Sequence, residues 1–241
     1  MSDQIDVIFP DLLGLTHGKT VPPNRLDHPT HYAITVMVQG LDLEFLDVPT
    51  YSTSSGFPDM EARVDLDTLR PWTGGRRTAM ASLYRTNGEP LPLDSRRQLQ
   101  LICSRWAARG LTPMSGFEME FFLLASRRPL VKLPVPDHRV YGIGAGADPS
   151  GTLEAIAELA ELAGLQVEGV NAEFTPSQVE AALHYQPAGA AADAALLFRE
   201  LVHEVSRSRG IDATFMARPF ADAVGSGLHL NMSLANSAGD N

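Results

Sequence analysis

Short runs of apolar residues, broken by turn residues, dominate the first ninety positions, and this pattern is typical of β-strands. Runs rich in β-branched or aromatic residues predict strands over 5–9, 34–38, 43–48 and 80–84. Glycine and proline punctuate the sequence between them, as at Pro22-Pro23 and Gly74-Gly75. We expect a small sheet domain with long loops over residues 1–93.

The pattern changes after residue 93, where helical and strand periodicities follow one another. Asp94 is predicted to cap a helix that runs to about Arg109, because apolar residues recur there every three or four positions and Gly110 follows. Further helices are predicted over 152–163 and 190–209, and strands over 111–124, 167–174, 179–185, 213–216 and 227–234. The fold class is therefore predicted to be α+β, with a second domain over residues 94–241.

Two segments that are predicted to form strands each contain a pair of glutamates. In GFEMEF, Glu118 and Glu120 share one face of a strand. In NAEFTPSQVE, residues 175–178 are predicted to form a hairpin turn, with Glu173 and Glu180 as a cross-strand pair. Taken singly, each segment is more simply explained as a solvated sheet face or a charged edge strand.

A third segment, GSGLHLNMSL, places His229, Asn231 and Ser233 on one face of a strand. Its alternate residues, Leu228, Leu230, Met232 and Leu234, are predicted to face the core. A lone histidine is usually structural, but four carboxylates with one imidazole suit Mg²⁺ or Mn²⁺ better than zinc or copper. Two such ions would neutralise the phosphates of a nucleotide.

Composition narrows the class of protein. The 241 residues are 44% hydrophobic, which excludes global disorder, and carry a net charge of −10, which argues against binding to nucleic acid or to an anionic membrane. We find no spanning segment and no signal peptide, and we expect a soluble, cytoplasmic protein. A single cysteine, Cys103, excludes an internal disulfide and a cysteine-based zinc cluster.

The motifs GFEMEF, NAEFTPSQVE, Met216-Ala217-Arg218-Pro219 and GSGLHLNMSL occur in this order, after a D-xx-G-xxx-GK pattern at residues 11–19. Together they resemble the glutamine synthetase family in its type I-like branch. The resemblance implies an opening strand pair within a β-grasp-like N-terminal domain over 1–93. It also implies the first half of a catalytic domain, built on a curved antiparallel sheet, over 94–241.

The resemblance further implies ATP-dependent ligation of the γ-carboxylate of glutamate to ammonia or an amine through γ-glutamyl phosphate, in a ring-forming homo-oligomer. By motif matching, Glu120, Glu173 and Glu180 would hold one Mg²⁺ or Mn²⁺ near the amino acid. Glu118 and His229 would hold a second ion between the ATP phosphates. Gly225 would lie in a loop that contacts the substrate, and Ser233 near the nucleotide phosphates. No residue is assigned as a catalytic acid or base.

Departures from the family pattern leave alternatives open. Family members are typically much longer, so the purified chain is expected to transfer little or no glutamyl group. Asn231 stands where many members have a second histidine, and residues 51–56 lack the aspartate of ammonia-using members, which favours larger amines. One alternative is an inactive relative that assembles with a full-length homologue. A guanidino kinase is disfavoured, because that fold lacks the N-terminal domain and relies on arginines.

Overall fold

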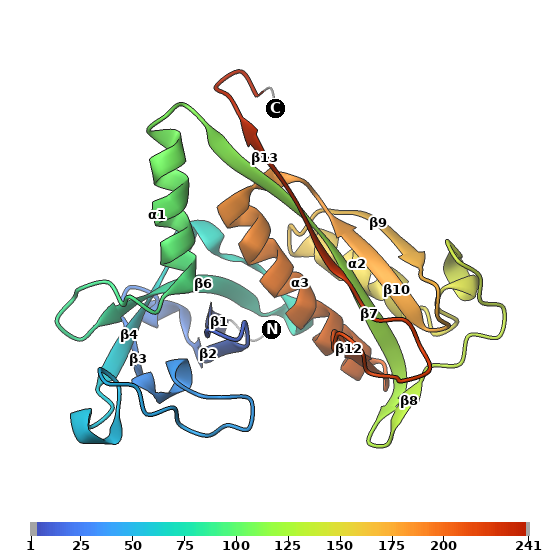
Figure 1. Cartoon of the computed structure of the whole chain (residues 1–241), viewed down its shortest axis with the longest axis horizontal. Coiled ribbons are helices and arrows are strands. Elements are labelled where there is room, and N and C mark those ends of the chain that lie inside the picture. The colour runs from blue at the N-terminus through green and yellow to red at the C-terminus, as the bar shows by residue number, and fades with distance from the viewer. Residues whose placement is uncertain (1–3, 240–241) are drawn as a thin grey trace. The chain divides into compact units, whose positions relative to one another are not determined.

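Two β-sheets, one in each half of the chain, organise the structure (Figure 1). The computed structural model describes residues 4–239, and its contacts divide them into one unit up to Arg105 and a second from Trp106 onward. The α+β class predicted from the sequence is confirmed. Most of the helix after residue 93 lies in the first unit, whereas the sequence analysis assigns it to the second domain. The boundary at residue 93 stays a prediction.

The elements have the following bounds. The strands are β1 (Ile5–Pro10), β2 (Thr16–Val21), β3 (Thr30–Ala33), β4 (Asp59–Val64), β5 (Arg70–Pro71), β6 (Arg77–Arg85), β7 (Thr112–Arg127), β8 (Leu130–Lys132), β9 (Val167–Ala172), β10 (Gln178–Leu183), β11 (Gln186–Pro187), β12 (Asp212–Thr214) and β13 (Leu228–Ala235). The helices are α1 (Ser95–Ala107), α2 (Thr152–Leu162) and α3 (Ala188–Ser208).

The sheet of the first unit has the strand order β2-β1-β6-β4-β3, and β5 also pairs with β6. Alternate residues of β1 are buried, so Ile5, Val7 and Phe9 enter the core while their neighbours are half-exposed. The expected opening strand pair is present as β1 and β2, which run antiparallel. Asp11 shapes the turn between them by accepting hydrogen bonds from the backbone of Leu13 and Leu15, each at 2.8 Å.

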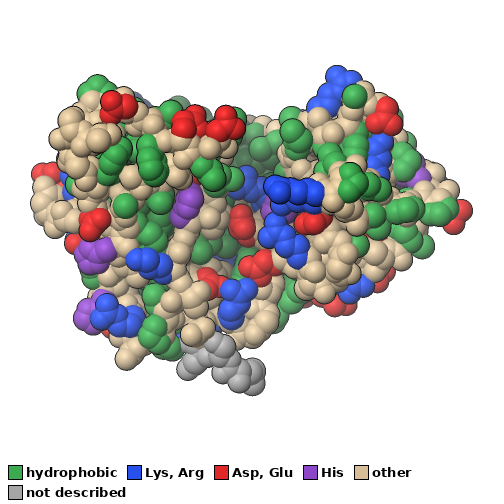
Figure 2. Space-filling view, turned by 90° about the horizontal axis from the view of Figure 1, so that it is seen from below, with side chains coloured by type: hydrophobic (Ala, Val, Ile, Leu, Met, Phe, Trp, Pro, Cys, Tyr) green, Lys and Arg blue, Asp and Glu red, His purple; other side chains and the backbone are tan. Residues whose placement is uncertain are grey.

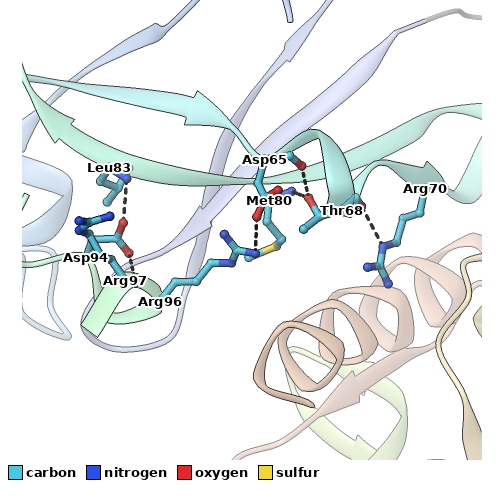
Figure 3. A network of polar contacts seen from close by, with 8 residues as sticks. All are labelled: Asp65, Thr68, Arg70, Met80, Leu83, Asp94, Arg96 and Arg97. Atoms are coloured by element: carbon cyan, nitrogen blue, oxygen red, sulfur yellow. Dashed lines mark hydrogen bonds and ion pairs between the residues drawn. The ribbon is translucent and has the colours of Figure 1, made fainter. Parts of the chain in front are cut away.

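Buried polar side chains tie α1 to this sheet (Figure 3). One carboxylate oxygen of Asp94 accepts the backbone N–H of Arg97 at 3.1 Å, which confirms the predicted helix cap. The other oxygen accepts the N–H of Leu83 in β6 at 2.8 Å. In the same network the hydroxyl oxygen of Thr68 accepts a hydrogen bond from the backbone N–H of Met80 at 2.8 Å. The start of α1 is therefore fixed both by its own cap and by the sheet.

Two of the predicted N-terminal strands are wrong. Residues 34–38 form a 3₁₀ turn over Ile34–Met37, in which Ile34 and Met37, three residues apart, are both buried. Residues 43–48 make only isolated bridges. Leu43, Phe45 and Leu46 are exposed, and Val48 at the end of the run packs against the core. The pattern of apolar residues does not predict β3 and β4, because these strands carry many charged and polar residues, although Met60 and Ala62 of β4 are buried.

The second unit is built around β7, the long strand seen in Figure 1. Strands β10, β11, β12, β13 and β8 all pair with it antiparallel, and β9 pairs with β10. Here the strands and helices predicted after residue 110 are confirmed, with shifts at their ends and with β8 and β11 added. Because five strands pair with β7, the face of the sheet to which each β7 side chain points determines which side chains from different strands lie together.

Helices α2 and α3 pack on each other and against this sheet. The buried side of α3 includes Phe198, Leu201 and Val202. On β7, Met119 and Phe121 are buried, and the Phe121 ring lies 4.9 Å from that of Phe215. Glu118 and Glu120, on the alternate positions, are half-exposed, as alternation predicts.

On the face shown in Figure 2, lysine and arginine side chains are interspersed with acidic ones, and apolar side chains reach the surface among them. No helix within residues 4–239 is long and apolar enough to cross a membrane.

Candidate functional site

Strand register brings acidic residues from separate motifs to one face of the second sheet. In the β7–β10 pair, Glu120 lies directly opposite Glu180. In the β7–β13 pair, Glu118 lies directly opposite His229. Since β10 and β13 both pair with this part of β7, these four side chains form one cluster, called here the carboxylate face.

The closest part of the carboxylate face consists of Glu118, Glu180 and His229, whose ligand atoms all lie within 4.8 Å of one another. Nδ1 of His229 is 3.0 Å from Oε2 of Glu118, and the amide of Asn231 donates to Oε1 of the same carboxylate at 2.9 Å. A spacing of about 3 Å is also that of adjacent ligands around an octahedral ion with bonds of about 2.1 Å. The imidazole and this carboxylate are therefore spaced as two neighbouring ligands would be.

The loop before β13 leaves room for these groups. A Cβ atom at Gly227 would lie 2.8 Å from Oε1 of Glu120 and 3.3 Å from Nε2 of His229. The first distance is shorter than real Cβ contacts, so a side chain at this position would displace the Glu120 carboxylate, and glycine lets that carboxylate stay where it is. The hollow above Gly227 thus faces both an acidic oxygen and an imidazole nitrogen.

Negative charge accumulates at Glu180. Burial is the largest cause that raises the pKa of its carboxyl group, followed by the charges of Glu173, Glu118 and Glu120, while His229 lowers this pKa. A carboxylate that other carboxylates repel gains stability when a cation binds between them. The electrostatics of the face therefore favour a bound cation.

Glu173 does not pair with Glu180 as predicted. The 175–178 turn forms, with the N–H of Gln178 donating to Thr175 at 2.9 Å, but Glu180 lies opposite Asn171 and Glu173 follows the end of β9. Glu173 belongs to the closing end of the turn instead, because the backbone N–H of Glu173 donates a hydrogen bond to the carbonyl of Gln178 at 2.8 Å. Glu173 still acts electrostatically on Glu180, although it is outside the closest group.

Gln178, which lies within the second motif, is a site residue that was not predicted from the sequence. Its side chain is fully buried, and Nε2 donates to Oε2 of Glu120 at 3.1 Å and to the carbonyl of Gly225 at 2.9 Å. The signal available in the sequence was its position two residues before Glu180, which places both side chains on the same face of one strand.

Gly225 and Ser233, the other predicted site residues, lie on either side of the carboxylate face. Gly225 is in the loop before β13, where the N–H of Ser226 donates to the carbonyl of Ala217 at 2.8 Å. The hydroxyl of Ser233 on β13 is hydrogen-bonded to that of Tyr185. The tyrosine ring reaches it across β7 at Gly116, where a Cβ would lie 3.4 Å from the ring.

The apolar side of β13 departs from expectation. Leu228, Leu230 and Met232 were predicted to face the core, but they are 62%, 49% and 66% exposed, and Leu234 is 37% exposed. Alternation correctly separated them from His229 and Asn231, but within residues 4–239 no layer covers them.

The residues present fit a hard divalent cation. Carboxylate oxygens predominate, one imidazole accompanies them, and no cysteine lies in the closest group. Glu118, Glu180 and His229 have the closest geometry, and Glu120 adjoins them across from Glu180.

The chain is similar to known proteins over most of its length. Residues 92–241 match the family described as "Glutamine synthetase, catalytic domain". Type-1 glutamine synthetase 2 of Dictyostelium discoideum is 31% identical over 80% of this chain and 39% of its own length. Gamma-glutamylputrescine synthetase PuuA of Escherichia coli is 27% identical over 98% of this chain and 54% of its own length.

A solved structure agrees with the sequence comparisons. "Apo GmaS without ligand" superposes with a TM-score of 0.83 at 26% identity, over 99% of this chain and 56% of that chain. The chain thus spans about half the length of the relatives it matches, or less. The family match covers more than half of the sequence, and the chain belongs to the glutamine synthetase family.

Proposed function

We propose that the protein containing this chain is an ATP-dependent ligase that joins the γ-carboxylate of glutamate to ammonia or an amine. The observation that carries the proposal is the carboxylate face, where Glu118, Glu180 and His229 meet from three strands. Membership of the glutamine synthetase family supports the same reaction.

In this proposal the chain supplies charge and position. Glu120, Glu173 and Glu180 would hold one divalent ion near glutamate, and Glu118 and His229 a second near the ATP phosphates. The ions would neutralise the negative charge that gathers as a phosphoryl group moves from ATP to the γ-carboxylate. Phosphorylation turns a poor electrophile into a good one, and the amine then displaces phosphate.

The remaining residues would place the substrates. The loop at Gly225 would contact glutamate, and Ser233 would lie near the nucleotide phosphates. Because the hydroxyl of Ser233 is hydrogen-bonded to the hydroxyl of Tyr185, the tyrosine would fix the orientation of the serine hydroxyl.

We propose an alkylamine or polyamine as the acceptor. Between residues 48 and 58 the sequence has no carboxylate, and Ser52 and Ser55 use their hydroxyls to cap a 3₁₀ turn at Thr53–Ser55. Two relatives, gamma-glutamylputrescine synthetase and a Pseudomonas glutamate–isopropylamine ligase that is 30% identical, are named for such amines.

The test is phosphate release by the protein containing this chain, with Mg²⁺, ATP, glutamate and a series of amines from ammonium to putrescine. Release that requires glutamate and an amine together is expected, and faster release with larger amines supports the proposed acceptor. ATP hydrolysis that is indifferent to both would contradict the ligase. The second candidate, an inactive partner, predicts no turnover by itself but altered turnover when it is mixed with a full-length homologue.

A further inference from the structure

We infer that Gln178 is a positioning residue that couples the carboxylate of Glu120 to the glycine loop at residues 225–227. The inference rests on the proposed function, since it concerns the metal and substrate sides of that same site. Gln178 is not assigned to touch the metal ion or the substrate itself.

The side-chain amide of Gln178 has one orientation. Its nitrogen faces two acceptors, Oε2 of Glu120 at 3.1 Å and the carbonyl of Gly225 at 2.9 Å. If the amide were rotated by 180°, its oxygen would face these two acceptor oxygens, and the three lone-pair-bearing atoms would repel one another. An NH₂ group carries two hydrogens, so it serves both acceptors at once, and burial keeps water from replacing it.

This contact decides which oxygen of Glu120 is available. Gln178 holds Oε2, and Oε1 lies beside the hollow at Gly227, near Nε2 of His229. The glutamine therefore turns one oxygen toward the carboxylate face and keeps the other occupied. Outer partners that orient a ligating carboxylate in this way strengthen metal binding.

The loop is held at two points by the same glutamate. The backbone N–H of Glu120 donates to the carbonyl of Gly227 at 3.1 Å, and its carboxylate reaches Gly225 through Gln178. A cation that fixes the position of the Glu120 carboxylate is therefore expected to order the loop as well. By reciprocity, a ligand that orders the loop favours the cation.

The experiment uses the chain as it exists, Mn²⁺ alone as the probe, and Gln178→Met, which keeps the size of the side chain without its donor. Calorimetric titration measures Mn²⁺ affinity, and amide hydrogen exchange follows residues 217–228 with and without Mn²⁺. In the native chain Mn²⁺ is expected to slow exchange in this segment. In Gln178→Met we expect about tenfold weaker Mn²⁺ binding, faster loop exchange without metal, and no further slowing by Mn²⁺.

Gln166→Met is the matched control, because Gln166 is exposed on the segment before β9, and it should leave both measurements unchanged. Equal affinity and an equal loop response in Gln178→Met would overturn the inference. If the native chain does not bind Mn²⁺, the metal assignment of the proposed function fails, while metal-free loop exchange still decides the role of Gln178. If Gln178→Met does not fold, Gln178→Leu, which also lacks a donor and carries no charge, takes its place. A native chain that binds Mn²⁺ without any response of the loop would also overturn the inference.

Discussion

At the scale of single residues, the carboxylates of the site differ in what compensates their charge. Both oxygens of Glu118 have partners, His229 and Asn231, and Glu120 is held by Gln178. For Glu180, burial and neighbouring acidic groups raise the pKa. The charge of Glu180 therefore costs folding free energy in the absence of a cation, and a cation bound beside it would offset this cost.

Glu180→Gln should raise the melting temperature of the metal-free chain and reduce the further rise caused by Mn²⁺. The folded state keeps the proton of Glu180 to a higher pH than the unfolded state does, so this residue lowers stability increasingly as pH rises above its ordinary pKa. Removing the charge removes that cost, together with one cation ligand. Thermal unfolding at pH 7 with and without Mn²⁺ measures both effects.

Glu161→Gln, on the exposed side of α2, is the matched control and should leave the response to Mn²⁺ unchanged. A variant Glu180→Gln with an undiminished Mn²⁺ response would show that Glu180 is not a ligand.

His203 on α3 makes stability depend on pH through a different cause. Burial, then the positive charges of Arg207, Arg199 and Arg127, lower its pKa from 6.5 to about 4, while Asp212 opposes the shift. The unfolded chain binds this proton and the folded chain does not, so stability falls as pH drops from about 6.5 to about 4.

In His203→Gln this part of the loss should disappear. Between pH 7 and pH 5 it amounts to about 2 kcal/mol, given about 1.4 kcal/mol for each pH unit below 6.5. Urea unfolding at pH 7 and pH 5 measures the difference. If that difference were the same in the native chain and the variant, His203 would not be its source.

At the scale of elements, helix ends and hairpin turns are held by polar side chains that bind the backbone. Asp94 serves two elements at once, since it caps α1 and satisfies the N–H of Leu83 in β6. In the second sheet, Gln178 joins β7 to the loop before β13 in a similar way. Each such residue therefore stabilises a junction between elements rather than one element alone.

Asp94→Ala should cost about 2 to 3 kcal/mol of stability, because it removes a helix cap and leaves the buried N–H of Leu83 without its acceptor. Asp94→Asn keeps one acceptor oxygen and should cost less. Urea unfolding followed by tryptophan fluorescence compares the two variants. Equal stability of Asp94→Ala and the native chain would contradict the double role of Asp94.

At the scale of the whole molecule, the second sheet carries chemistry on one side of β13 and an apolar stripe on the other. Leu228, Leu230 and Met232 of that stripe are largely exposed, and among residues 4–239 β13 pairs only with β7. An apolar stripe beside an unpaired strand edge favours association with another surface.

The chain is therefore expected to self-associate with rising concentration. Replacing Leu228, Leu230 and Met232 together by Thr keeps strand propensity, removes the apolar area, and should shift the population toward monomer. Light scattering over a wide concentration range measures this shift. Leu162→Thr, at the exposed end of α2, is a control that should not change the association. A native chain that stays monomeric throughout would contradict the expectation.

The sequence alone determined the features that depend on neighbours a few positions away. Alternation separated Glu118 and Glu120 from Met119 and Phe121, the helix cap at Asp94 was readable from its residue type, and the 175–178 turn was readable from Pro and its polar neighbours. Local conformational preferences act over such distances, and a period of two places side chains on faces without any knowledge of partners.

Only the tertiary structure decided which side chains meet across strands. Register places Glu180 opposite Glu120 of β7, and opposite Asn171 of β9 rather than Glu173. It also turns the buried side chain of Gln178 toward the loop at Gly225. Register depends on pairing between distant segments, and a slip of one residue would move every side chain to the other face. For the same reason periodicity could assign the apolar residues of β13 to one side, but whether another layer covers that side depends on packing between distant segments.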